Sequence, residues 1–336
     1  MKLRIATRKS KLALTQTRWV AERIREHTPG VDIEEVHVVT EGDRVLDKPL
    51  AAIGGKGLFV TEVEATLLDG RADLAVHSMK DVPNELSAGL EITCIPERED
   101  PRDALITPGG IEIDALPAGA RVGTSSLRRS CQLKGHRPDL DFATLRGNVD
   151  TRLRKLTEGR YGAIVLAMAG LRRLSLLDDR HWIIPVDICI PAVGQGALGI
   201  EARIGDEATA RLIAPLGHAA TRVAVEAERA FLHELQGSCK VPVAGHATTS
   251  DGGNRLRFDG MVGSVDGSRI LSGSSERYIQ ERSEGERLSA ARQLGREVAE
   301  GLLAKGAADL IREGIATVER ALAQGNGSGP KSGRWS

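Results

Sequence analysis

The fold class follows from the segment Arg121-Val122-Gly123-Thr124-Ser125-Ser126-Leu127-Arg128, in which a short strand runs through a Gly/Thr/Ser turn into a helix. The same arrangement occurs near the start of the chain, in Arg4-Ile5-Ala6-Thr7-Arg8-Lys9-Ser10. A second pair of segments also corresponds, residues 70–76 (GRADLAV) and residues 159–165 (GRYGAIV). Because both pairs occur in the same order, the sequence predicts two related α/β lobes.

Strand-like runs alternate with helical patterns as far as about residue 215, which favours α/β sheets over a helical bundle. Charged or proline-containing segments near residues 94–102 and 190–193 indicate where the chain crosses between the lobes. An amphipathic helix over residues 221–235, followed by Gly- and Ser-punctuated strands, is typical of an α+β domain. We therefore expect lobe 1 to comprise residues 1–96 and 197–215, lobe 2 residues 102–190, the C-terminal α+β domain residues 219–312, and a helical extension with a flexible tail residues 313–336.

The composition argues against several classes of protein. The chain has 46 basic and 46 acidic residues and only 3% aromatic residues, whereas nucleic-acid binders usually carry a basic excess or stacking aromatics. No apolar run approaches the roughly 20 residues of a membrane span, and the first residues lack a signal-peptide core. The four cysteines form no CxxC pair, so neither a metal site nor a disulfide framework is indicated. We expect a soluble, cytoplasmic protein.

Arginines concentrate beside small hydroxyl residues in the second lobe, at Arg128, Arg129, Arg146 and Arg152. A guanidinium matches a carboxylate or phosphate with two parallel hydrogen bonds, and a Gly/Ser/Thr turn that opens a helix adds backbone donors. In open α/β sheets the ligand lies beyond the carboxyl ends of the strands. The pattern indicates a small, multiply anionic ligand in an interlobe cleft, although a solvated helix face remains an alternative interpretation.

Two further segments carry reactive groups. Lys80 and Asp81 follow a predicted buried strand and precede Pro83, so the carboxylate of Asp81 could act as an acid, a base or a stabiliser of a cation. Cys239 lies in a Gly/Ser turn beside Lys240, which would favour a thiolate nucleophile. The alternatives are an exposed turn pair for Lys80 and Asp81, and a small buried hydrophobic residue for Cys239.

Two glycine-rich segments resemble nucleotide motifs without fulfilling them. Residues 194–199 fit GxGxxG, but Pro191 interrupts the preceding strand and the segment lies far from the first βαβ unit. Residues 54–59 contain Lys56 but lack the glycine spacing and the following Ser or Thr of a Walker motif. We interpret the polar and glycine-rich stretch at about residues 40–60 as a lid over the cleft.

Taken together, the segments at residues 4–10, 54–59, 76–83, 123–129, 145–148 and 237–242 resemble the porphobilinogen deaminase (hydroxymethylbilane synthase) family over residues 3–312. The resemblance implies two lobes like those of periplasmic binding proteins and a C-terminal α+β domain that carries the cysteine. It also implies a transferase of porphyrin (tetrapyrrole) biosynthesis, which condenses four porphobilinogen molecules head to tail, with loss of ammonia, into hydroxymethylbilane. The reaction is primed by a dipyrromethane cofactor joined to a cysteine through a thioether.

The resemblance also implies roles for individual residues, including Asp81 as the catalytic carboxylate and Cys239 as the attachment point of the dipyrromethane. Other contacts to the cofactor are implied for Lys80, Thr124, Ser126, Arg128, Arg129, Asn148 and Arg152. Substrate contacts are implied for Arg8, Ser10, Arg146, Arg173 and Gln195, with Phe59 of the lid stacking on a pyrrole ring. The sequence departs from the family pattern at Ser238, Lys240 and Ala52, and Ala52 places a lid lysine in doubt. A monomer is expected, which hands its product to uroporphyrinogen-III synthase.

Two other functions remain open at this point. A non-catalytic bilobal protein that binds small anions would use the same arginines but would have no need of Cys239. A cysteine-dependent hydrolase would pair Cys239 with His233 or His246 as its base.

Overall fold

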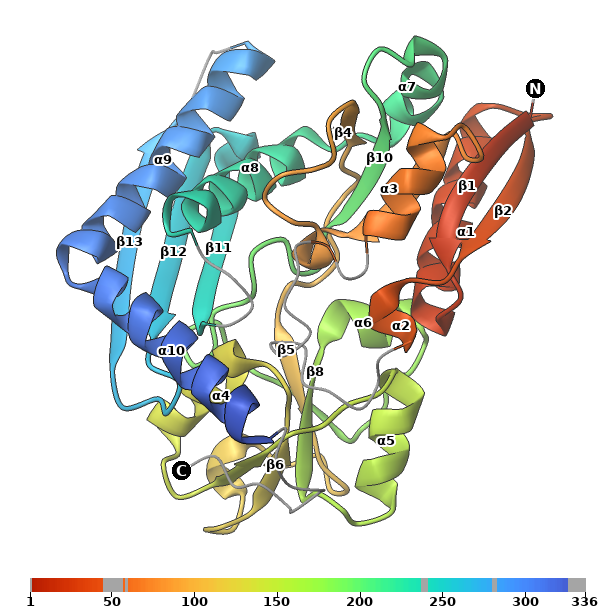
Figure 1. Cartoon of the computed structure of the whole chain (residues 1–336). Coiled ribbons are helices and arrows are strands. Elements are labelled where there is room, and N and C mark those ends of the chain that lie inside the picture. The colour runs from red at the N-terminus through yellow and green to blue at the C-terminus, as the bar shows by residue number, and fades with distance from the viewer. Residues whose placement is uncertain (1, 45–56, 58–59, 237–240, 280–282, 326–336) are drawn as a thin grey trace.

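Two α/β lobes and a smaller α+β domain make up the molecule (Figure 1). The computed structural model describes residues 2–44, 57, 60–236, 241–279 and 283–325. These residues form two five-stranded mixed sheets and one three-stranded antiparallel sheet. The predicted fold class is therefore confirmed.

Lobe 1 is built on a sheet with the strand order β2-β1-β3-β10-β4. Its strands are β1 (Lys2–Arg8), β2 (Asp32–Val38), β3 (Leu74–Ser78), β4 (Leu90–Cys94) and β10 (Leu198–Arg203). Its helices are α1 (Lys11–His27), α2 (Glu41–Arg44), α3 (Thr61–Leu68) and α7 (Glu207–Ile213). Strand β1 pairs in parallel with β2 and β3, whereas β10 runs antiparallel to both of its neighbours.

Lobe 2 repeats this arrangement with the strand order β7-β6-β8-β5-β9. Its strands are β5 (Asp103–Ile106), β6 (Arg121–Gly123), β7 (Asp141–Ala143), β8 (Ala163–Ala167) and β9 (His181–Ile183). Its helices are α4 (Leu127–His136), α5 (Val149–Thr157) and α6 (Met168–Arg173). The segments that correspond in the sequence occupy equivalent places, because β6 and β8 pair in parallel as β1 and β3 do.

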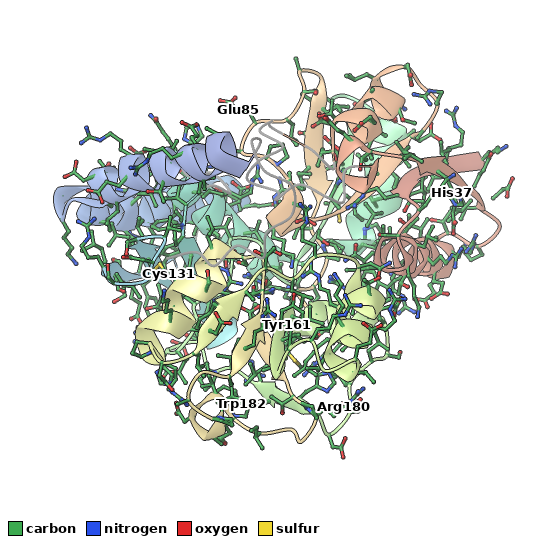
Figure 2. The ribbon with its side chains drawn as sticks, turned by 60° about the horizontal axis from the view of Figure 1, so that its bottom comes forward. His37, Glu85, Cys131, Tyr161, Arg180 and Trp182 are labelled. Atoms are coloured by element: carbon green, nitrogen blue, oxygen red, sulfur yellow. The ribbon has the colours of Figure 1, made fainter. Side chains whose placement is uncertain are left out.

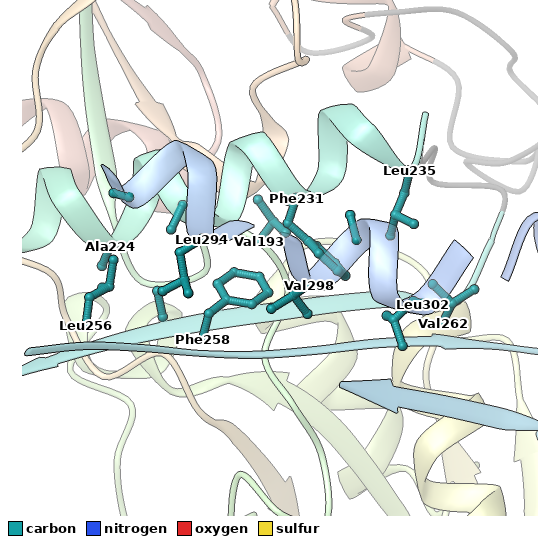
Figure 3. Close-up of a cluster of buried hydrophobic side chains, with 14 of the residues drawn as sticks. Val193, Ala224, Phe231, Leu235, Leu256, Phe258, Val262, Leu294, Val298 and Leu302 are labelled. Carbon is teal, nitrogen blue, oxygen red and sulfur yellow. The ribbon is translucent and has the colours of Figure 1, made fainter. Parts of the chain in front are cut away.

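The C-terminal domain packs helices on one face of its antiparallel sheet. The sheet consists of β11 (Val243–Ser250), β12 (Arg255–Gly263) and β13 (Ile270–Tyr278), and the helices are α8 (Ala219–Glu234), α9 (Glu284–Ala304) and α10 (Ala307–Gly325). The core between these layers is centred on Phe231 of α8 and Phe258 of β12, whose ring centroids lie 4.9 Å apart (Figure 3). Helix α8 is the amphipathic helix that the sequence predicts.

Close contacts at glycines join the C-terminal domain to lobe 2. A Cβ atom on Gly263 of β12 would lie only 2.3 Å from the Sγ atom of Cys131. Cys131 is fully buried on α4, where lobe 2 meets the C-terminal domain (Figure 2). Any larger side chain at residue 263 would therefore push the two domains apart.

Within the part of the chain that the structure describes, every helix falls short of the length or the apolar composition that a membrane-spanning helix needs.

The crossing of α8 and α9 gives a first testable prediction. A Cβ atom on Gly295 of α9 would lie 2.0 Å from the backbone oxygen of Ala227 on α8, whereas one on Gly301 of the same helix would meet nothing within 4 Å. We expect Gly295→Ala to lower the free energy of unfolding by about 1–3 kcal/mol through overpacking. The matched control Gly301→Ala should raise it by up to about 1 kcal/mol through helix propensity. Urea unfolding measures both, and equal effects of the two substitutions would contradict the close approach.

Candidate active site

The turn after β3 presents Lys80 and Asp81 at the carboxyl end of the lobe 1 sheet. A backbone hydrogen bond holds the start of this 3-10 turn (Met79–Asp81), because the N–H of Met79 donates to the carbonyl of Ala197 at 3.0 Å. Gly194 lies against the same turn with φ +71°, and a Cβ atom there would lie 2.8 Å from the carbonyl carbon of Met79. The glycine of the GxGxxG-like segment therefore supports the Lys80–Asp81 turn in this fold.

A pocket in lobe 1 adjoins Asp81. Its polar lining residues are Thr7, Arg8, Ser10, Gln16, His77, Ser78 and Asp81. Two residues that the sequence assigns to the substrate, Arg8 and Ser10, therefore lie beside the predicted catalytic carboxylate. Ser10 also begins α1, because its hydroxyl oxygen accepts the backbone N–H of Ala13 at 3.3 Å.

The sequence analysis missed a buried hydrogen-bonded pair of side chains at this pocket. His77 Nε2 lies 2.8 Å from the Oε2 atom of Glu201 on β10, and both side chains are almost completely buried. Glu201, an acidic residue that follows the apolar residues 198–200 of β10 (Leu198–Arg203), is the signal that could have indicated it.

The hydroxyl and amide residues predicted in lobe 2 shape the starts of two helices. Ser126 is the N-cap of α4 and accepts the backbone N–H of Arg129 at 3.4 Å, while Thr124 Oγ1 accepts the N–H of Ser126 at 3.2 Å. Asn148 is the N-cap of α5 and accepts the N–H of Thr151 at 2.9 Å. These side chains hold the turns in place, and the ends of α4 and α5 add their positive dipoles to the site.

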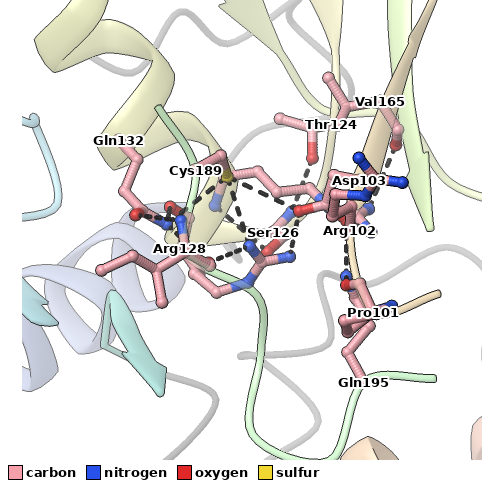
Figure 4. A network of polar contacts seen from close by, with 12 residues as sticks. Pro101, Arg102, Asp103, Thr124, Ser126, Arg128, Gln132, Val165, Cys189 and Gln195 are labelled. Atoms are coloured by element: carbon pink, nitrogen blue, oxygen red, sulfur yellow. Dashed lines mark hydrogen bonds and ion pairs between the residues drawn. The ribbon is translucent and has the colours of Figure 1, made fainter. Parts of the chain in front are cut away.

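Arg128 and Arg129 converge on one buried carboxylate, Asp103 at the start of β5. Figure 4 shows Arg128 and Asp103 within this network of polar contacts. Arg128 Nη2 lies 2.8 Å from Asp103 Oδ2, and Arg129 donates from Nε and Nη2 to Asp103 Oδ1 at 3.1 and 2.7 Å. Burial alone would raise the pKa of the Asp103 carboxyl, but the two guanidiniums hold it well below its ordinary range. Gln195 Nε2 adds a hydrogen bond of 2.9 Å to the same carboxylate.

The sequence analysis treats Arg128 and Arg129 as ligand-binding residues, but in the structure both also form ion pairs with Asp103. Arg128 also donates to the carbonyl of Ile190 at 2.7 Å, and Arg129 to that of Val165 at 3.1 Å, so both side chains are oriented by protein groups. The sequence analysis did not select Asp103. An acidic residue that opens the apolar strand Asp103–Ile106 directly after Pro101-Arg102 could have indicated it.

Other cations of the site have lowered pKa values. Nearby protein groups lower the pKa of Lys80 to about 8 through desolvation, with Asp81 opposing this shift and Arg129 adding to it. The residue nevertheless stays exposed to solvent. Enclosure likewise lowers the pKa of Arg152 to about 10, helped by Arg129 and Arg146 and opposed by Asp81.

Arg173 extends this set of cations toward the crossover segment. Enclosure by protein lowers its pKa to about 10, and its Nη2 atom donates to the carbonyl of Gly196 at 2.7 Å. Burial is the main cause of the lowered pKa values of Arg152 and Arg173, and for Arg152 neighbouring cations add to it. Carboxylates of a bound ligand would stabilise these charged groups, so the chemistry of the donors fits an oligopyrrole that carries acetate and propionate groups.

Two predicted site residues, Phe59 and Cys239, lie outside the described residues, as does most of the predicted lid. The other cysteines are buried, and burial raises the pKa of Cys94 to about 11 and those of Cys131 and Cys189 to about 12. These three thiols are therefore poor nucleophiles near neutral pH.

The two lobes, with cations of lobe 2 near Lys80 and Asp81 of lobe 1, define a bilobal α/β protein with a site suited to a small polyanion, extended by an α+β domain. Residues 3–211 match the family model "Porphobilinogen deaminase, dipyromethane cofactor binding domain", and residues 222–304 match "Porphobilinogen deaminase, C-terminal domain". The chain belongs to the porphobilinogen deaminase family, as its sequence motifs predict.

Curated relatives agree with this assignment over nearly the whole chain. The porphobilinogen deaminase of Brevibacillus brevis is 49% identical over 312 residues, which is 93% of this chain and 97% of the relative. That of Syntrophotalea carbinolica is 52% identical over 91% of this chain and 93% of the relative. That of Nitratidesulfovibrio vulgaris is 52% identical over 92% and 95%, respectively.

The lowered pKa of Lys80 gives a pH prediction. A bound carboxylate should raise this pKa, so the complex holds a proton that the unbound protein loses above about pH 8. Affinity for a pyrrole with acetate and propionate but no aminomethyl group should therefore fall by up to about tenfold per pH unit above pH 8. Calorimetry on the Cys239→Ser protein, which cannot form the thioether, measures this affinity. The additional substitution Lys80→Arg should remove the decline, and an unchanged decline would exclude Lys80 as its source.

Proposed function

We propose that this chain condenses four porphobilinogen molecules head to tail into hydroxymethylbilane, with release of ammonia, and that Asp81 is its catalytic carboxylate. Family membership supports the reaction. The observation that carries the site assignment is the pocket that Asp81 shares with Arg8 and Ser10. Asp81 also lies close enough to Arg152 of lobe 2 to oppose the lowering of the pKa of that guanidinium. One carboxylate thus faces a group of cations that can hold an anionic substrate around it.

Asp81 suits the step in which ammonia leaves. Loss of ammonia from porphobilinogen leaves a cation delocalised over the ring and its methylene carbon. A fixed carboxylate lowers the energy of such a developing cation, and it also accepts hydrogen bonds from pyrrole N–H groups. Arg8 and Ser10, which line the same pocket, are placed to hold the carboxylates of the incoming ring.

The remaining cations would hold the primer and the growing chain. Each added ring brings an acetate and a propionate, so negative charge accumulates with every step. Lys80, Arg146, Arg152 and Arg173 supply charge for these groups, and Arg128 and Arg129 contribute through the donors that Asp103 leaves available. The dipyrromethane, when joined to Cys239, supplies the pyrrole carbon to which the first ring is added.

We propose further that the enzyme works as a cytoplasmic monomer. Release of a reactive linear tetrapyrrole favours transfer to a cyclising enzyme, for which uroporphyrinogen-III synthase is our proposed partner. Size-exclusion chromatography with light scattering tests the oligomeric state.

Intact mass spectrometry under denaturing conditions tests the proposed function first. We expect an excess mass equal to two linked pyrrole units, and none in Cys239→Ser, because the thioether needs that sulfur. Conversion of porphobilinogen to hydroxymethylbilane by the loaded protein completes the test. A protein that remains unmodified after incubation with porphobilinogen, yet binds pyrrole carboxylates, would instead be the non-catalytic anion-binding protein.

A second test concerns Asp81. The Asp81→Asn protein should keep its fold and its covalent dipyrromethane but lose turnover by about 10²–10³-fold, because the shape is kept while the charge opposite the cation is removed. Steady-state kinetics and intact mass on the same sample measure the two properties. Near-normal turnover in the folded, loaded variant would refute the role of Asp81.

A further inference from the structure

We propose that Arg229, on helix α8 of the C-terminal domain, is a positioning residue that fixes Asp81 by holding the backbone directly after it. The inference rests on the proposed function only in naming Asp81 as the group that is positioned. Arg229 itself is assigned no contact with substrate or cofactor.

Arg229 reaches from α8 to three consecutive carbonyls of lobe 1. Its Nη2 atom donates to the carbonyl of Pro83 at 2.9 Å and to that of Asn84 at 3.0 Å, and its Nη1 atom lies 3.5 Å from that of Val82. Val82 immediately follows Asp81, and its own N–H donates to the carbonyl of Met79 at 3.2 Å. The planar guanidinium thus fixes the direction in which the chain leaves the Lys80–Asp81 turn.

The rest of α8 supports the same turn from other directions. Val225, fully buried on α8, packs in one apolar cluster with Met79 and Val82. Glu228, the neighbour of Arg229, accepts the backbone N–H of Gly194 at 2.6 Å, and Gly194 lies against the turn. Helix α8 therefore contacts the segment before Asp81 through packing and the segment after it through Arg229.

The position of α8 in the chain gives this contact a functional meaning. The helix ends at Glu234, and Cys239 follows only five residues later. The helix that contacts the Asp81 turn is therefore close in the sequence to the proposed attachment point of the growing chain.

Arg222 provides a matched control on the same helix. Its Nη1 atom also donates to a lobe 1 carbonyl, that of Thr93 at 3.1 Å, but Thr93 belongs to β4 and not to the Asp81 turn. If these arginines only join the C-terminal domain to lobe 1, then Arg222→Met and Arg229→Met should have similar effects. If Arg229 positions Asp81, their effects should differ.

The first measurement is hydrogen exchange, which does not depend on turnover. Amides in a peptide covering residues 77–88 should exchange at least tenfold faster in the loaded Arg229→Met protein than in the wild type, and at an unchanged rate in Arg222→Met. Equal exchange in all three proteins would overturn the proposal, whether or not the chain proves to be a deaminase. Absence of turnover in the wild type would instead refute the proposed function.

Kinetics on loaded protein provide the second measurement. Arg229→Met should lower kcat by tenfold or more with KM within about twofold, because displacement of a catalytic group affects the transition state more than substrate binding. Arg229→Lys should recover only part of this loss, since one ammonium cannot replace a planar fork across three carbonyls. In the Asp81→Asn background, Arg229→Met should change kcat less than twofold. A full additional loss in that background, or an equal loss in Arg222→Met, would overturn the positioning role.

Discussion

The arrangement of the three domains depends on one buried carboxylate, that of Glu228 on α8. It pairs with Arg98 of the first crossover at 2.6 Å and accepts the backbone N–H groups of Gly194 in the second crossover and Ala247 on β11, at 2.6 and 2.8 Å. Burial alone would raise its pKa, but the Arg98 guanidinium and His246 lower it to about 2. A carboxylate that stays ionised inside the protein must keep these donors around it, so both crossovers are tied to the C-terminal domain.

The proposed site is subject to a second electrostatic constraint. Several cationic side chains must be held close together before an anionic ligand binds. Asp103 solves it for Arg128 and Arg129 by supplying a permanent carboxylate and a fixed orientation. Within the described part of the chain, Lys80, Arg152 and Arg173 have no comparable buried carboxylate among the causes of their pKa shifts that outweighs burial. Burial therefore lowers the pKa values of all three side chains. The protein therefore presents a preorganised frame around cations that a carboxylate-rich ligand would neutralise.

Much of the fold could be predicted because it follows from local sequence patterns. The two corresponding strand-turn-helix segments contain β1 and β6, which occupy equivalent positions in the sheets of the two lobes. The site residues were predicted from motifs, and the structure brings Arg8, Ser10 and Asp81 to one pocket. Asp103 and Glu228 were missed because their partners are far away in the sequence, at separations of 26 for Arg129 and 130 for Arg98. Sequence periodicity cannot report a pairing of that kind, and an acid on an apolar face is only an indirect sign of it.

The place of β10 has a consequence for the order of folding during synthesis. This strand lies between β3 and β4 in the lobe 1 sheet, yet it is encoded after the whole of lobe 2. Lobe 2, whose strands are continuous in sequence from Asp103 to Ile183, can complete its sheet while lobe 1 still lacks an interior strand. A ribosome must therefore release residue 203 before the N-terminal lobe can close, and the emerging chain exposes an unpaired β3 edge until then.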